Sequence, residues 1–311
     1  MRFYFLIVAS FFFNPFVRAQ TLPFPSGIPL TTATISATIA YDSADDVFVY
    51  NYLVSNSKQS VGVVSAFYVD ISTSAGGAVL SSADLTNSAT GYSGFGSAVS
   101  LSRIVKNATV PVGFKSQPAG WNSGSTAQFT AGWFGPLPPG APIAPGQSLG
   151  TFVLVSHGLP GIRHFTAKPR YDPADFLPGI DEVPDAIAQQ VVDLDNEIQR
   201  VIQTRGYTIG PVQPPSLTDV GRLLDFVASL KHQALTLGWI SGPGAEGVVQ
   251  SLDAKLSAAK ASISSGDKKT AINQLNAFIN ELQAQHGKAI SDNAFYLLQP
   301  NALFVISKLG S

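Results

Sequence analysis

The chain has 311 residues, with 19 basic and 20 acidic side chains, four histidines and no cysteine. Its formal charge of −1 leaves no basic surplus, which argues against a nucleic-acid partner because phosphate binding depends on clustered Lys and Arg. The lack of cysteine excludes disulfides, thiolate metal ligands and a cysteine nucleophile. Packing must therefore stabilise the fold.

The first 19 residues have the pattern of a secretory signal peptide. Arg2 precedes an apolar run over residues 3–13, and the helix-breaking Pro15 follows it. The run has about 11 residues, far fewer than the roughly 20 that a membrane-spanning helix needs. We therefore predict export, with a short membrane anchor or a core helix as the alternative.

The predicted cleavage site lies between Ala19 and Gln20, because Val17 and Ala19 supply the side chains expected before such a site. Cleavage would remove Arg2 and Arg18, so that 17 basic residues remain against 20 acidic ones. After cleavage we expect no membrane span, and the slightly acidic mature chain gives no further reason to expect nucleic-acid binding.

Residues 31–170 are predicted to form an antiparallel β-sandwich. A Pro-rich lead over residues 20–30 comes first, and Val47–Val54 is then the clearest strand, since it is rich in β-branched and aromatic residues. Many short strands separated by Gly and Pro turns, without a helical period, favour a sandwich over an α/β fold. The other expected strands cover residues 61–71, 99–105, 126–134, 148–156 and 162–167.

Residues 171–216 are expected to be an acidic, Pro-rich connector that contains one helix at about residues 185–204. Apolar residues recur there at helical spacing, at Ile187, Val191, Leu194, Ile198 and Val201. Residues 206–209 are a further strand candidate. Pro211 to Pro215 would form a stiff spacer, because proline-rich runs favour polyproline II.

Residues 217–309 are predicted to form a small bundle of three to four helices. Apolar side chains recur every three or four residues in three stretches, which run from Val220 to Ala234, from Val249 to Ile263 and from Ile272 to Leu282. Amphipathic helices joined by short turns bury their apolar faces most simply against one another. A fourth, poorer helix from Ser291 is expected to stop or kink near Pro300.

The bundle region resembles the FIMAH domain, a small helical module appended to bacterial secreted and cell-surface proteins. The resemblance covers roughly residues 217–309 and implies an extracellular accessory module with no catalytic residues. It is carried by Gly238-Trp239-Ile240, Leu252-Asp253-Ala254-Lys255-Leu256, Gln274-Leu275-Asn276-Ala277-Phe278-Ile279 and Gly287-Lys288-Ala289-Ile290-Ser291.

The β region is similar, less specifically, to uncharacterised sandwich modules of secreted bacterial proteins. This second resemblance implies only the fold class and an extracellular setting. It is carried by Tyr50 to Asn56, Gly120-Trp121, Trp133 and Ile143 to Leu149.

Aromatic residues in or beside Gly- and Ser-rich loops are the candidate ligand-binding residues. Flat rings exposed at such positions can stack on sugar rings. The alternative is that the rings cover the ends of the sandwich core, since tryptophan is mostly buried. The candidates are Tyr92, Phe95, Trp121 and Trp133.

Three carboxylates, Asp42, Asp45 and Asp46, gather in the turn before the clearest strand. Oxygen-rich loops suit Ca²⁺, so this cluster is the candidate site for a structural calcium ion, and no other cofactor is expected. An ordinary solvated acidic turn is the alternative. The same acids are the candidates for a weak glycan-hydrolase carboxylate pair.

Catalytic motifs are missing from the sequence. Residues 91–95 lack the final glycine of a Gly-x-Ser-x-Gly elbow, and no glycine-rich loop precedes a Gly-Lys-Ser/Thr sequence. His157 and His164 would need a third ligand to bind zinc.

The sequence thus predicts an exported, non-catalytic interaction or accessory protein with an extracellular protein or glycan partner. A carbohydrate-binding module or weak glycan hydrolase is the alternative function. A spacer whose bundle merely presents the sandwich is a third possibility.

Overall fold

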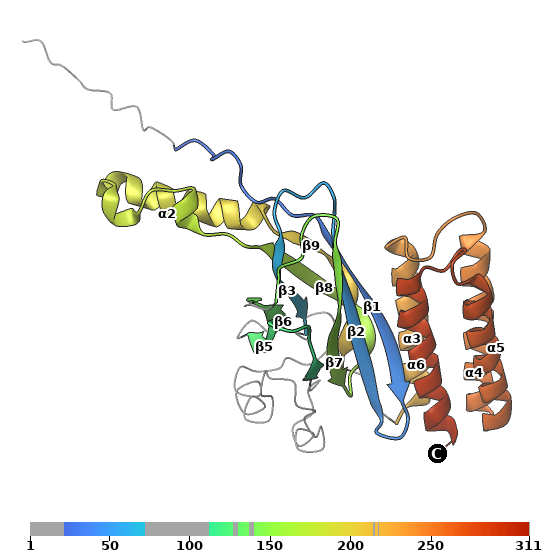
Figure 1. Cartoon of the computed structure of the whole chain (residues 1–311). Coiled ribbons are helices and arrows are strands. Elements are labelled where there is room, and N and C mark those ends of the chain that lie inside the picture. Colours follow the sequence, from blue (N-terminus) through green and yellow to red (C-terminus); the bar gives the residue numbers. More distant parts are fainter. Residues whose placement is uncertain are drawn as a thin grey trace, which may run out of the picture. The chain divides into compact units, whose positions relative to one another are not determined.

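The computed structural model describes residues 22–71, 112–126, 130–136, 140–213, 215–216 and 218–310. The chain divides into two compact units, of which one comprises residues 28–171 and 201–311 and the other residues 1–27 and 172–200. The strands and the last four helices of the described chain lie in the first unit (Figure 1).

The strands of the described chain pair only with antiparallel neighbours, in two sheets. The four-stranded sheet has the order β1-β2-β7-β4 and the five-stranded sheet the order β5-β6-β3-β8-β9. The strand bounds are β1 Ala33–Asp42, β2 Val47–Asn56, β3 Val64–Asp70, β4 Val112–Ser116, β5 Asn122–Thr126, β6 Thr130–Phe134, β7 Ser148–Ser156, β8 Leu159–Pro169 and β9 Thr204–Val212.

The two sheets bury one aromatic core between them, which confirms the predicted sandwich. The ring of Tyr52 on β2 lies 5.5 Å from that of Trp133 on β6, and the ring of Phe67 on β3 lies 4.8 Å from that of Phe152 on β7. Strand β1 shows the reason for this layering, because its buried residues alternate with exposed or partly exposed ones. Alternating side chains point to opposite faces of a strand, so each sheet has one apolar inner face.

Strand β9 lies in the stretch expected to be a connector. It pairs with β8 from Leu159↔Val212 to Ala167↔Thr204 and forms one edge of the five-stranded sheet. The edge position tolerates Pro211, which cannot donate a backbone hydrogen bond, and Gly206 leaves room for the ring of Phe165. The strand candidate over residues 206–209 is thus the middle of a longer strand.

The short strands β4 and β5 were not expected from the sequence. The sequence of β5, Asn-Ser-Gly-Ser-Thr, contains turn-forming residues and no apolar side chain, so it carries no strand pattern. It forms a hairpin with β6, which divides the strand expected over residues 126–134. The strand expected over residues 99–105 lies outside the described residues.

Helices α3 to α6 form the predicted bundle, in which α3 packs on α4 and α6, and α5 packs on the same two helices. Asp219 caps α3 by accepting a hydrogen bond from the Arg222 amide, and Asp267 caps α5 by accepting one from the Thr270 amide. The helix bounds are α3 Val220–Thr236, α4 Ala245–Ser264, α5 Lys268–Gln285 and α6 Asp292–Gly310.

A buried lysine links α3 to α4. Lys231 is fully buried, and its Nζ donates to the Val249 carbonyl at 3.1 Å and pairs with the carboxylate of Asp253. Burial lowers the pKa of Lys231, and the hydrogen bond and charge of Asp253 oppose that shift. A buried ammonium that is paired in this way fixes the register of the two helices at that point.

Helix α6 continues through Pro300, where the sequence led us to expect a stop or a kink. Asn301, which is buried, donates its side-chain amide to the Leu297 carbonyl at 2.7 Å and to the Pro160 carbonyl at 2.8 Å. These bonds tie the helical turn around the proline to the start of β8.

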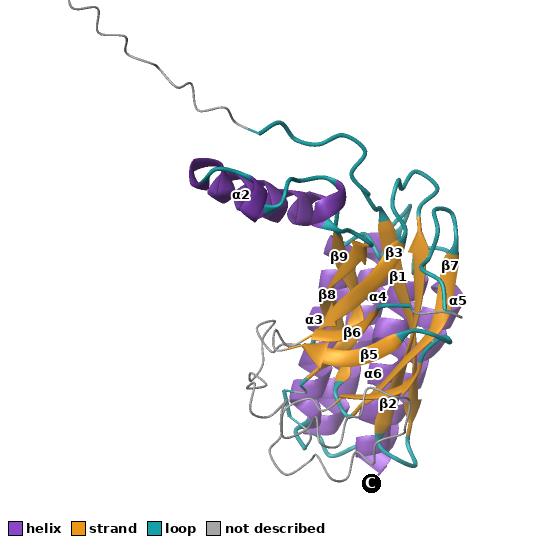
Figure 2. Ribbon diagram, turned by 60° about the vertical axis from the view of Figure 1, so that its left-hand side comes forward, coloured by secondary structure: helices purple, strands orange, loops and turns teal. Residues whose placement is uncertain are grey.

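Helix α6 also joins the bundle to the sandwich. It contacts β1, β8 and β9 as well as α3 and α5, and both views show α3–α6 grouped on one side of the strands (Figures 1 and 2). Strands β1 and β9 are edges of different sheets and lie against each other, where the Ala33 amide donates to Thr204 Oγ1 at 3.0 Å. The helix therefore covers the seam at which the two sheets meet.

The second unit contains α2, Asp185–Val201, and two short 3₁₀ turns, η3 Pro173–Asp175 and η4 Ile180–Glu182. The helix matches the one expected at about residues 185–204, and Val191 and Ile198 on its apolar stripe are buried. Asp172 caps the first 3₁₀ turn by accepting a hydrogen bond from the Ala174 amide.

Candidate functional site

The two tryptophans named as candidate ligand contacts lie in the sandwich core. Trp133 is 0% exposed and Trp121 is 3% exposed. Trp133 stacks on Phe67 with the ring centroids 4.8 Å apart, and Trp121 meets Phe152 edge to face at 5.1 Å. Rings buried in this way cannot stack on a sugar, so the burial supports the core interpretation of both. Tyr92 and Phe95 lie outside the described residues.

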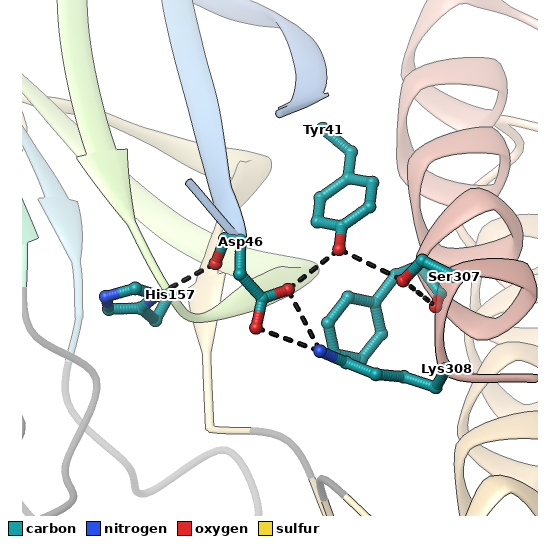
Figure 3. A network of polar contacts seen from close by, with 6 residues as sticks. Tyr41, Asp46, His157, Ser307 and Lys308 are labelled. Atoms are coloured by element: carbon teal, nitrogen blue, oxygen red, sulfur yellow. Dashed lines mark hydrogen bonds and ion pairs between the residues drawn. The ribbon is translucent and has the colours of Figure 1, made fainter. Parts of the chain in front are cut away.

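The acidic cluster lies at the turn between β1 and β2. Asp42 ends β1 and accepts a hydrogen bond from the Ala44 amide at 3.0 Å, and Asp45 is exposed. Asp46 has a backbone φ of +54°, in the left-handed region that aspartate tolerates better than most residues. This conformation ends the turn and directs the Asp46 side chain towards α6 (Figure 3).

The carboxylate of Asp46 is held by groups from both halves of the first unit. Lys308 on α6 donates to its two oxygens at 3.0 and 2.9 Å, and the hydroxyl of Tyr41 on β1 donates to one of them at 2.7 Å. Figure 3 shows the tyrosine and the lysine approaching the carboxylate from different elements. We call Tyr41, Asp46, His157, Ser307 and Lys308 the junction network.

The environment shifts the pKa of two members of the network. Partial burial would raise the pKa of Asp46, but hydrogen bonds from Lys308 and Tyr41 and the charge of Lys308 outweigh it, so that the pKa lies below its usual value. Burial raises the pKa of Tyr41 to about 12; the contact with Ser307 opposes that shift, and the bond to Asp46 adds to it. At neutral pH Asp46 is therefore a carboxylate and Tyr41 a neutral phenol.

Ser307 and His157 complete the network. They do not contact each other, so they are not arranged as a nucleophile and its base. Ser307 Oγ lies 3.0 Å from the Tyr41 hydroxyl and also donates to the Phe304 carbonyl at 2.7 Å. His157 Nδ1 lies 2.8 Å from the backbone carbonyl of Asp46, on the other side of the aspartate from Ser307 (Figure 3).

A serine hydrolase requires histidine between the serine and the acid, because the imidazole takes the proton of the serine. Here Asp46 and Tyr41 lie between His157 and Ser307 (Figure 3). The arrangement therefore tethers α6 to the β1–β2 turn and lacks the order of a catalytic triad.

The three expected calcium ligands, Asp42, Asp45 and Asp46, lie at the turn between β1 and β2, and the Asp46 carboxylate is engaged by a lysine. The side-chain amine of Lys308 donates to both carboxylate oxygens of Asp46, where a bound calcium ion would otherwise sit. Over the described ranges, no group of three or more His, Cys, Asp or Glu residues could hold a metal ion. His164, the other histidine considered as a ligand, packs on Tyr207 with the ring centroids 4.5 Å apart.

Comparison with protein families identifies the bundle. Residues 237–307 match the FIMAH domain. The FIMAH match covers α4, α5 and most of α6, and it begins just after α3, which ends at Thr236. The resemblance seen in the sequence over residues 217–309 thus corresponds to a FIMAH core to which α3 adds a packed helix.

No curated protein matches the chain in sequence. Among the described helices, none is long and apolar enough to cross a membrane. The FIMAH domain supplies Ser307 to the junction network as the last residue of the match, and Lys308 follows directly.

Sequence reasoning missed Tyr41, Ser307 and Lys308, since single polar residues on strands and helices carry no local pattern. The spacing of these residues gives no sign of the contact, because 262 positions separate Asp46 from Lys308. The cluster of acids in the turn and His157 were the available signals, and both suggested a metal rather than a lysine.

We predict that Asp46 and Lys308 couple energetically at neutral pH and lose this coupling in acid. The pair is partly exposed, so a double-mutant cycle with Asp46→Asn and Lys308→Met should give about 0.2–1 kcal/mol at pH 7. Because folding lowers the pKa of Asp46, its contribution is present above the unfolded pKa of about 3.9 and is lost as pH falls through the folded pKa.

Denaturant unfolding of the four proteins at pH 7 and in acid measures this coupling. Asp45→Asn removes an exposed acid from the same turn and should leave the stability within about 0.5 kcal/mol of the starting protein. A coupling energy of zero at pH 7, or one that is unchanged in acid, contradicts the assignment.

Proposed function

We propose that this chain is an exported, non-catalytic interaction protein that acts at the cell surface or in the extracellular space. The observation that carries the proposal is the FIMAH match. The resemblance of this module to domains appended to bacterial secreted proteins implies an accessory role, and a partner outside the cytoplasm follows from that role.

The N-terminal sequence supports the location. Arg2, the short apolar run and the Ala19 boundary are typical of an exported precursor. The absence of cysteine is compatible with an oxidising compartment, because such a chain needs no disulfide and cannot form a wrong one.

The polar groups of the junction network support a non-catalytic role. The Asp46 carboxylate is engaged by Lys308 and Tyr41. A general acid or base must reach a substrate with its titrating group, and these contacts use the Asp46 carboxylate for structure. The alternative function, a weak glycan hydrolase that uses Asp42, Asp45 or Asp46, has no such support.

We predict that the mature protein binds to cell envelopes or extracellular matrix. A tagged protein starting at Gln20 should remain on cell envelopes or extracellular matrix of the producing bacterium more strongly than a tag-only control. The proposal fails if the first wash removes the protein from both the envelopes and the matrix as completely as it removes the tag-only control. The variant Asp45→Asn, changed at an exposed turn residue, serves as the matched preparation control.

We also predict that export removes the first 19 residues. Replacing Leu6 by Arg places a charge in the apolar run and should keep the uncleaved protein in the cytoplasm, because a charged residue disfavours insertion of that run. Mass spectrometry of the exported protein should give a chain beginning at Gln20. An exported protein that still carries Met1, or export that Leu6→Arg leaves intact, contradicts this assignment.

A further inference from the structure

The outer face of the five-stranded sheet carries a group of aromatic and cationic side chains that the junction network does not use. Phe67 and Val69 on β3 point into the core and are fully buried. Tyr68 lies between them on the strand and therefore projects to the opposite side. The same alternation places His164 and Lys168 on that side of β8, since Phe165 and Ala167 face the core.

The strand register brings these residues together. Tyr68 pairs with Thr166, which pairs in turn with Arg205 on β9, and His164 pairs with Tyr207 one row away. Residues that pair across antiparallel strands share a face, and neighbouring strands lie about 4.8 Å apart. We call Tyr68, His164, Lys168, Arg205 and Tyr207 the aromatic face; Figure 2 shows the strands that carry it.

The side chain of Tyr68 extends over the neighbouring strand β6. A Cβ added to Gly132 on β6 would meet the ring of Tyr68 at 2.5 Å, so the glycine leaves the space that the ring occupies. The edge of the ring formed by Cδ1 and Cε1 therefore lies over β6, and the Tyr68 side chain is half-buried.

A second ring pair lies on β8 and β9. His164 and Tyr207 have ring centroids 4.5 Å apart at an interplanar angle of 37°. Both side chains are exposed, and Tyr207 is 45% exposed. Two rings in contact with each other and exposed on a sheet face offer a stacking surface to a ligand.

The exposed region has a defined border. Ile162 and Ile209 form the next pair along β8 and β9 on the same face, and Ile209 is fully buried. Helix α6 contacts both strands. Within the described part of the first unit, the bundle thus covers the Ile162–Ile209 end of this face, and the aromatic face lies beyond that end.

The aromatic face also carries a cationic surplus. Lys168 Nζ lies 5.4 Å from the centroid of the Tyr68 ring, and Arg205 is exposed two residues before Tyr207 on the same side of β9. Asp70 lies on this side of β3 and already interacts with another residue of the chain. Two permanent cations thus lie beside two flat phenol rings.

We infer that the aromatic face binds an acidic polysaccharide, with sugar rings stacked on Tyr68 and Tyr207 and uronate carboxylates paired with Lys168 and Arg205. Aromatic rings present apolar surface to the apolar face of a sugar, and guanidinium and ammonium groups bind carboxylates through charge-assisted hydrogen bonds. A neutral glycan would leave the two cations without a counterpart. The inference rests on the proposed function and names the partner class.

A nucleic acid fits the same chemistry less well. Its binding requires several phosphates to be neutralised, whereas the mature chain has more acids than bases and the aromatic face holds two permanent cations. An acidic peptide would use the cations but has no regular series of flat rings or faces to stack on Tyr68 and Tyr207.

The test uses mature protein, paired variants and three acidic polysaccharides, namely polygalacturonate, alginate and hyaluronate. Highly methyl-esterified polygalacturonate is the matched neutral probe, because it keeps the sugar and removes the charge. Polyglutamate and single-stranded DNA represent the other anions. Affinity electrophoresis gives the ranking, and calorimetry gives Kd for the tightest ligand.

We predict binding to at least one acidic polysaccharide and weaker binding to the other probes. Replacing Tyr68 and Tyr207 together by Ala, or Lys168 and Arg205 together by Gln, should each raise Kd about tenfold or more. Raising the ionic strength to about 0.5 M should weaken binding as well. The controls Leu53→Ala and Lys115→Gln change exposed residues of the four-stranded sheet and should leave Kd unchanged.

The inference is overturned if none of the three acidic polysaccharides binds. It is also overturned if the esterified probe, polyglutamate or DNA binds as tightly as the acidic polysaccharides, or if folded variants of the aromatic face bind as tightly as the wild-type protein. Circular dichroism and melting temperature verify that each variant is folded. If the wild-type protein stays on envelopes or matrix and the variants stay equally well, this inference fails and the proposed function stands. If the wild-type protein is not retained at all, the proposed function fails.

Discussion

The packing of α6 between the bundle and the sandwich is the contact on which the rest of the structure depends. The side chain of Phe304 is buried between the two, and its ring lies 5.5 Å from that of Tyr41 and 5.7 Å from that of Phe48. Leu297 is buried two turns earlier on the same side, and Leu298 and Val305, roughly a third of a turn around the helix, are also buried. A helix that is apolar on nearly every side is stable only when it is surrounded.

This packing also protects the sandwich. Strands β1 and β9 are sheet edges, and an exposed edge offers unpaired backbone groups to other chains. The two edges lie against each other under α6, and Asn301 fixes the helix to the start of β8. The junction network adds a polar tether near the end of the helix, where Lys308 reaches the β1–β2 turn. The FIMAH domain thus packs directly on the sandwich through α6.

The sequence was informative where a side-chain period reports burial directly. β2, β7, α4 and α5 each have one apolar face, and their period identifies both the element and its buried side. Helix α6 looked weaker from the sequence because apolar residues surround it, and a helix buried on several sides shows no single stripe. Strand β9 was expected only over residues 206–209, because Gly210 and Pro211 belong to turns more often than to strands.

Long-range contacts were outside the reach of sequence patterns. The rings of Trp121 and Trp133 are near Gly-rich segments in sequence, yet Trp133 on β6 and Trp121 just before β5 both enter the core. Asp46 was recognised as part of an acidic turn, but its lysine lies at the other end of the chain. The aromatic face depends on the register among β3, β8 and β9, so Tyr68, Lys168 and Tyr207 cannot be grouped until the sheet order is known.

The central claim is that α6 makes the sandwich and the bundle one cooperative unit. Differential scanning calorimetry of the chain from Gln20 tests it most directly, because cooperativity appears as agreement between the calorimetric and van't Hoff enthalpies. We predict one main transition that includes both the sandwich and the bundle. Replacing Phe304 by Ala removes the ring between them and should shift this whole transition to lower temperature. Two separate transitions, of which Phe304→Ala shifts only the one belonging to the bundle, would contradict the account.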